Sequence, residues 1–160
     1  MCNILYYWDY FTKTHIKNIF SGSGNINIPA NNTTVNKVNI NFKNINNDKF
    51  TFTVTNNQIN IIPKYNNKYI YLLYGDAYVS NTGTNQYPRL EVVWSGNILS
   101  TSSCNTLISA ALVTTDGYLL NLFSSITNDG PTYINIYAIA QSAQDTIITI
   151  PNLVIKIIEQ

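Results

Sequence analysis

Few side chains in this 160-residue sequence could carry out chemistry. It contains a single histidine, His15, and eight carboxylates, and these show no clustered spacing of the kind that zinc or calcium sites need. A nucleophile activated by His15 would require the N-terminal segment to fold back into a pocket, so we interpret His15 as a surface or interface residue. The sequence therefore predicts no metal ion and no cofactor.

Paired carboxylates are the remaining route to catalysis, because two acids across a cleft can hydrolyse a glycosidic bond. Most of the acids occupy turns, and Asp76 and Glu91 are the two in segments with strand patterning. Glu91 follows Arg89 by two positions on one strand face, which favours an ion pair between them. Asp76 directly follows Gly75, which favours a bulge in that strand. We predict a protein that is not an enzyme. A small β-sandwich hydrolase is the weaker alternative.

The charge balance excludes several classes of partner. Charged residues make up 11% of the chain and the net charge is +1, which gives no electrostatic footprint for nucleic acid or an anionic membrane. No stretch approaches the roughly 20 apolar residues of a membrane-spanning helix, and the N-terminus lacks the basic region of a signal peptide. We expect no nucleic acid, no membrane insertion and no secretory targeting. Cys2 and Cys104 are interpreted as small apolar residues, with a disulfide as the alternative.

Ser21-Gly22-Ser23-Gly24 has the composition of a flexible linker. It predicts two parts: residues 1–24 form an aromatic tail with its linker, and residues 25–160 form a β domain. The aromatic and aliphatic side chains of the tail need a surface to pack on, and we expect that surface to belong to a partner. The candidate anchor residues are Leu5, Trp8, Phe11 and Phe20.

Beyond the linker the chain alternates polar and apolar residues with the period of two that half-buried strands show. Residues 69–79 are apolar on both faces, which predicts a central strand, and Asn56-Asn57 predicts a two-residue turn. The predicted order is an all-β, antiparallel, two-sheet sandwich. Its expected strands cover 37–43, 50–55, 58–63, 69–79, 90–94, 107–113, 118–123, 133–140 and 147–158, with a loop at 98–103 and a turn at 128–131.

The 12 tyrosines indicate an assembly rather than a monomer. A two-sheet sandwich hides one face of each sheet, so an uncharged second face must meet another surface, and a symmetric oligomer provides one. Tyrosine is enriched at such interfaces. The candidate interface residues are Tyr71, Tyr133 and Tyr137.

Five segments spread over residues 34–122 resemble the strands of one family. They are Thr34–Phe42, Ile59–Pro63, Asn67–Leu72, Arg89–Asn97 and Asp116–Leu122, and they resemble the opening strand, the core strands and the hairpin of the C1q/TNF-like jelly roll. The order of elements extends the resemblance from residue 33 to the C-terminus, about four fifths of the chain. It implies a jelly-roll sandwich that forms a homotrimer and catalyses nothing, as in the head domains of viral and phage fibres.

On this resemblance we expect a structural protein of a virion, made in the host cytoplasm, that forms a fibre head or a capsid decoration. Residues 1–20 would then contact other virion proteins, and a host surface glycan or receptor is a further expected partner. A bacterial cell or spore surface is the alternative location. The alternative function is a carbohydrate-binding β-sandwich module, in which Trp94 or surface tyrosines stack on sugar rings.

Overall fold

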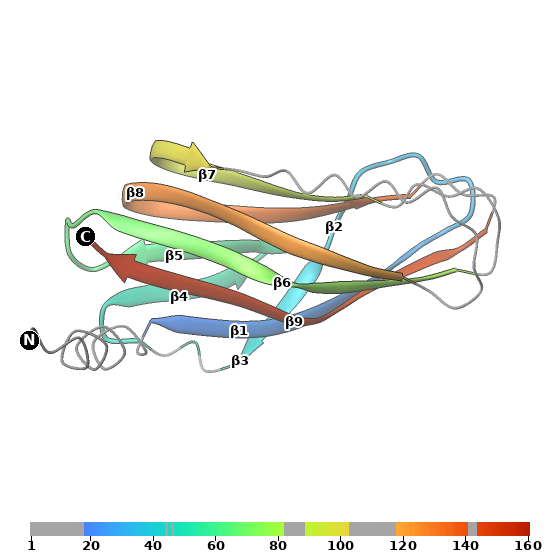
Figure 1. Cartoon of the computed structure of the whole chain (residues 1–160), viewed down its shortest axis with the longest axis horizontal. Helices are drawn as coiled ribbons and strands as arrows, with labels where there is room; N and C mark the ends of the chain where they lie inside the picture. The colour runs from blue at the N-terminus through green and yellow to red at the C-terminus, as the bar shows by residue number, and fades with distance from the viewer. Residues whose placement is uncertain (1–17, 44, 46, 82–88, 103–117, 141–143) are drawn as a thin grey trace, which may run out of the picture.

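The computed structural model describes residues 18–43, 45, 47–81, 89–102, 118–140 and 144–160, which form antiparallel strands without a helix (Figure 1). The predicted strand at 107–113 lies outside these residues. The strands that the structure describes are β1 (Ile19–Ile28), β2 (Asn36–Lys37), β3 (Asn39–Lys43), β4 (Phe50–Thr55), β5 (Gln58–Pro63), β6 (Tyr69–Asn81), β7 (Arg89–Ser102), β8 (Tyr118–Ile139) and β9 (Thr146–Glu159).

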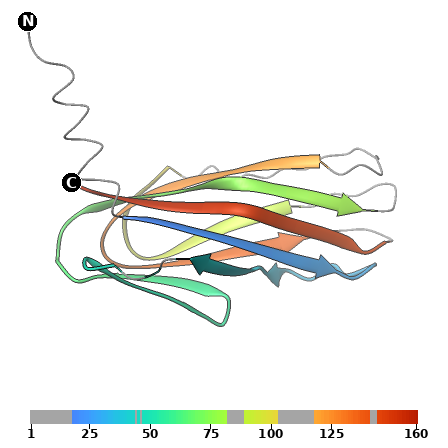
Figure 2. The ribbon, with the colours of Figure 1, turned by 90° about the horizontal axis from the view of Figure 1, so that it is seen from below.

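The strands form two layers that β8 joins, as the two views show (Figures 1 and 2). The first sheet has the order β3-β1-β9-β6 and continues into the N-terminal half of β8, which pairs with β6 from Tyr118 to Asn128. The second sheet holds the C-terminal half of β8 between β7 on one side and β5 and β2 on the other, with β4 beyond β5. This order confirms the predicted antiparallel jelly-roll sandwich.

Aromatic side chains fill the space between the two sheets. Phe20 of β1 stacks on Phe52 of β4 with ring centroids 4.3 Å apart, and Phe50 of β4 meets Tyr69 of β6 edge to face at 5.1 Å. At the opposite side the indole Nε1 of Trp94 donates a hydrogen bond of 2.6 Å to Ser124 Oγ, which joins β7 to the N-terminal half of β8. Each contact crosses from one sheet to the other, so together they hold the layers face to face.

The predicted linker is wrong, because Ser21-Gly22-Ser23-Gly24 lies inside β1, between β3 and β9. A Cβ on Gly22 would lie 2.9 Å from the backbone oxygen of Asn41, and a Cβ on Gly24 would collide with the backbone oxygen of Asn39. The glycines therefore allow a neighbouring strand to approach closely, and they do not act as a hinge. The boundary predicted at residue 24 falls within a paired strand.

Two further expectations need correction at β7 and β8. Residues 98–102, predicted as loop, extend β7, and the two strands predicted at 118–123 and 133–140 are one 22-residue strand. The predicted turn at residues 128–131 is instead the place where β8 passes from the first sheet to the second. Asn128 is fully buried there: its Nδ2 donates to Pro131 O at 3.1 Å and to Thr132 Oγ1 at 2.7 Å, and its Oδ1 accepts from the Asp129 amide at 2.8 Å.

Of the two short-range backbone predictions, the turn is confirmed and the bulge is not. Asn56 and Asn57 connect β4 to β5 with φ angles of 51° and 59°, the left-handed values that a tight hairpin turn requires. The bulge expected at Gly75-Asp76 is wrong: the register between β6 and β9 shifts beside Asp76, but one residue of β6 there lies opposite two residues of β9, so the extra residue belongs to β9.

Candidate functional site

The described residues bring no catalytic constellation together. Among them no group of three or more His, Cys, Asp or Glu side chains could hold a metal ion, and His15 lies outside them. Asp76 is exposed on the outer face of the first sheet, and Glu91 lies on the outer face of the second. The sandwich core separates these two acids, so they cannot flank one cleft as a glycosidase pair would.

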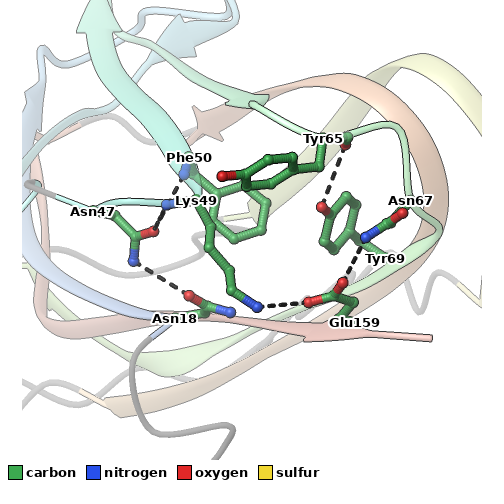
Figure 3. Close-up of polar contacts among 8 residues, drawn as sticks. All are labelled: Asn18, Asn47, Lys49, Phe50, Tyr65, Asn67, Tyr69 and Glu159. Carbon is green, nitrogen blue, oxygen red and sulfur yellow. Dashed lines mark hydrogen bonds and ion pairs between the residues drawn. The ribbon is translucent and has the colours of Figure 1, made fainter.

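A polar cluster fastens the end of β9 to the start of β4 (Figure 3). Lys49 Nζ lies 2.7 Å from Glu159 Oε2, and Asn67 Nδ2 donates to Glu159 Oε1 at 2.5 Å. Asn47 Oδ1 accepts hydrogen bonds from the Lys49 amide at 2.8 Å and the Phe50 amide at 3.2 Å.

The hydrogen bond to Glu159 raises the pKa of Lys49. Both partners of this ion pair are partly exposed, so it contributes about 1 kcal/mol or less. We interpret the cluster as a structural tie between the sheets.

One shallow hollow lies on the outer face of the first sheet, where Ser21–Ser23, Lys43 and Pro151-Asn152 meet. Its volume is about 80 Å³, room for a few water molecules and well below the roughly 300–1,000 Å³ of a typical ligand pocket. It carries a single charged side chain and does not form a binding site for a substrate.

The predicted site residues are not in one place. Leu5, Trp8 and Phe11 lie outside the described residues. Phe20 is 1% exposed inside the core, so its prediction as an anchor for a partner is wrong. Tyr71 is likewise fully buried between the sheets, where burial raises the pKa of its phenol to about 12, and it cannot contact a second subunit.

Tyr133 and Tyr137 do lie on an outer face, as the alternation of β8 predicted. Both are half-buried on the outside of the second sheet, while their neighbours Ile134 and Ile136 point into the core. A role for these two tyrosines in a subunit contact stays a prediction.

A larger exposed apolar surface lies on the outer face of the first sheet, and the sequence interpretation missed it. Tyr74 and Tyr78 of β6, Phe123 of β8 and Ile147 of β9 are exposed by 40–50%. Phe123 is directly opposite Tyr74, which in turn is opposite Val154 of β9, so the three side chains form one row across three strands. We call Tyr74, Tyr78, Phe123, Ile147 and Val154 the aromatic face.

The aromatic face has the electrostatic character of a contact surface. Asp76 and Lys156 are the charged side chains among the described outward positions of β6, of β9 and of β8 up to Asn128, and the half-buried Ile70, Leu72 and Ile158 extend the apolar area. At ordinary strand spacing and rise, three strands along the 13 residues of β6 span about 14 by 44 Å, roughly 600 Å². That is at the lower end of the roughly 600–1,000 Å² that each partner buries in a standard interface.

The sequence indicates that β6 has an apolar outer face, but it does not indicate which of the two faces that is. Residues 69–79 are apolar at both alternating sets of positions, so the pattern could not determine which set points inward. The structure buries the set that contains Tyr69, Tyr71 and Leu73, and it leaves Tyr74 and Tyr78 on the outside. Choosing Tyr71 as an interface residue selected the wrong face of the right strand.

Comparison with known proteins gives a structural similarity and no family. No family model matches the sequence, and no curated protein matches it. The solved structure of Eiger TNF from S. frugiperda matches over 84% of this chain and 92% of that chain, with 9% sequence identity and a TM-score of 0.35. The described part of the chain contains no helix long and apolar enough to cross a membrane.

Proposed function

We propose that this chain is a non-enzymatic structural protein that assembles into a homotrimer through the aromatic face. The observation that carries the proposal is the row of Phe123, Tyr74 and Val154 on the outside of the first sheet, in a chain with few charges. Tyr74 and Phe123 of this row are exposed while Val154 is covered beside them, and exposed apolar side chains gathered in this way mark an interaction surface in soluble proteins. A second copy offers an equally apolar surface. In a ring of three subunits each contact is heterologous, so the aromatic face of one subunit packs against a different patch of the next, and the same pair of patches recurs at every contact.

The setting that we propose is a virion, in which the trimer forms a fibre head or a capsid decoration. The resemblance of five strand segments to the head domains of viral and phage fibres supports this setting. The aromatic face supports the assembly itself, and it would serve equally well on a bacterial cell or spore surface, the alternative location.

Sedimentation equilibrium of the wild-type chain and of Phe123→Lys tests the assembly. Phe123 is 50% exposed, so burying the remaining half of its ring removes about 100 Å² from water and contributes about 2.5 kcal/mol per subunit. Losing it weakens each contact about 70-fold, and burying the lysine ammonium weakens it further. We expect the wild type to sediment as a trimer and Phe123→Lys as a monomer at micromolar concentration.

Ile62→Lys is the matched control, because Ile62 is 42% exposed on the outer face of the second sheet. We expect this variant to remain trimeric, and circular dichroism of both variants checks that the fold is intact. A monomeric wild type refutes the assembly. A trimer that survives Phe123→Lys places the subunit contact on another surface.

A further inference from the structure

The outer face of the second sheet presents a second, chemically different surface around β8. Tyr133, Asn135 and Tyr137 point outward from β8, since Ile134 and Ile136 between them are buried in the core. The register of the sheet places side chains of β7 on one side of them and side chains of β5 and β2 on the other. The flanking residues are Ser95, Val93 and Glu91 on β7, Asn60 and Gln58 on β5, and Lys37 on β2; with the three β8 residues they make up what we call the Tyr-Asn-Tyr face.

Asn135 at the centre of this face carries an unused hydrogen-bond acceptor. The residue is 7% exposed, and its Oδ1 is buried without a hydrogen-bond partner among the described residues. Leaving such an acceptor unpaired costs a folded protein about 1–3 kcal/mol. Because Oδ1 is covered in the free chain, a donor reaches it only when the neighbouring side chains shift on binding. A small hydroxyl group that does so recovers this cost, so the position favours a ligand rich in hydroxyl groups.

The two tyrosines supply the apolar part of the same surface. Tyr133 and Tyr137 are half-buried and four residues apart on one strand, a separation of about 13 Å. A tyrosine ring gives a rigid, amphipathic surface on which the apolar face of a sugar ring can pack, and the hydroxyl reaches the polar edge. The separation of the rings fits an oligosaccharide of several units better than a single sugar.

The charges on the face balance. Glu91 and Lys37 are its charged residues, and both lie opposite Tyr137, on β7 and β2 respectively. Lys37 Nζ stands 6.0 Å from the centroid of the Tyr137 ring, a cation–π distance. Ser95, Asn60 and Gln58 are neutral donors and acceptors. A neutral ligand therefore matches the surface better than an anionic one such as a sulfated glycan.

From the spacing of the rings, the unpaired acceptor and the balanced charge, we propose that the Tyr-Asn-Tyr face binds neutral oligosaccharides. The inference goes beyond the proposed function, because the aromatic face that would join subunits lies on the other sheet. Assembly through the first sheet leaves the second sheet open, and several copies of one weak site then bind a polyvalent glycan with increased avidity.

Isothermal titration and saturation-transfer NMR with maltotetraose, cellotetraose and chitotetraose test the proposal, with a heparin-derived tetrasaccharide as the charged comparison. We expect at least one neutral tetrasaccharide to bind and to receive saturation from tyrosine ring protons. Tyr137→Ala and Asn135→Ala are expected to weaken that binding about tenfold or more. Tyr137→Trp, which keeps an aromatic platform, is expected to retain it and shows that the site tolerates substitution without unfolding.

Two control variants separate this proposal from the assembly. Tyr65→Ala removes a tyrosine that is 58% exposed outside this face, and it should leave the dissociation constant unchanged within about twofold. Phe123→Lys should bind the tetrasaccharide as the wild type does even when it is monomeric. Failure of all three neutral tetrasaccharides to bind below about 10 mM overturns the proposal. So does a Tyr137→Ala variant that loses the oligomer and leaves sugar binding unchanged, because the face is then a subunit contact.

Discussion

Replacing Phe20 with alanine tests whether the chain before residue 25 belongs to the core. Phe20 is 1% exposed, lies in β1 between β3 and β9, and stacks on Phe52 of the opposite sheet at 4.3 Å. Truncating a buried phenylalanine costs about 3–5 kcal/mol, through lost apolar burial and the cavity that remains. This is a large part of the roughly 5–15 kcal/mol that stabilises a domain.

The assay is urea unfolding followed by circular dichroism, with all variants at the same chain concentration because assembly adds to apparent stability. With a denaturant slope of about 2 kcal/mol per molar, the midpoint of Phe20→Ala should fall by roughly 1.5–2.5 M. Ile19→Ala is the matched control, because Ile19 is the neighbouring residue of β1 and is 39% exposed. It should lose about 1 kcal/mol or less.

Deleting residues 1–24 extends the same test. The deletion removes Phe20 and half of β1, so we expect the cooperative unfolding transition to disappear. A truncated chain that unfolds like the full one, together with a Phe20→Ala midpoint within about 0.3 M of wild type, would refute the placement of β1 and restore a separate N-terminal tail.

Two further variants probe buried polar groups. Burial raises the pKa of Tyr71 from 10.0 to about 12, so the unfolded chain releases this proton at lower pH than the folded chain does, and stability falls as the pH rises from 10 to 12. The free energy of unfolding should fall by about 3 kcal/mol over this range. Tyr71→Phe should remove that part of the pH dependence in urea titrations at pH 9 and pH 12, and an unchanged pH dependence contradicts the assignment. Asn128→Ala leaves the amides of Asp129 and Gly130 without their acceptor at the crossing point of β8. We expect its free energy of unfolding to fall by about 2–4 kcal/mol in the same assay, and a fall below about 1 kcal/mol would show that the crossing does not depend on this side chain.

Local patterns in the sequence were sufficient for much of the sandwich. Strands with clear alternation, such as residues 50–55 and 58–63, are strands in the structure, and the Asn56-Asn57 turn between them has the expected left-handed conformation. These elements depend on period-two burial and on a two-residue turn. Both are properties of neighbouring residues, so a single sequence carries them.

The elements that the sequence misjudged depend on distant partners. Ser21-Gly22-Ser23-Gly24 has the composition of a linker, and its role in β1 depends on the close approach of Asn39 and Asn41 from β3. Asn128-Asp129-Gly130-Pro131 has the composition of a turn, yet burial of Asn128 by both sheets makes it the crossing of a continuous strand. The residues of each segment do not indicate which distant strands pack against it.

The candidate interface shows the same limit. The shortage of charge and the excess of tyrosine predicted that an outer face meets a partner, and the structure places aromatic side chains on one. The tyrosines on that outer face are the ones on the side of β6 opposite to Tyr69, because Tyr69 packs on Phe50 in the core. The alternation of β6 left both faces equally apolar, so the choice between Tyr71 and Tyr74 needed the packed structure.

Hydroxyl-radical footprinting with mass spectrometry tests the central claim, that the aromatic face is the contact between subunits. Phe123 is 50% exposed in the single chain and Tyr65 is 58% exposed in a loop, so in a monomer both side chains should oxidise readily. The account predicts that Phe123 and Tyr74 are protected relative to Tyr65 at concentrations where the protein is trimeric, and that dilution removes the protection. Oxidation of Phe123 and Tyr74 at rates that do not change with concentration, in a protein that sediments as a trimer, would contradict it.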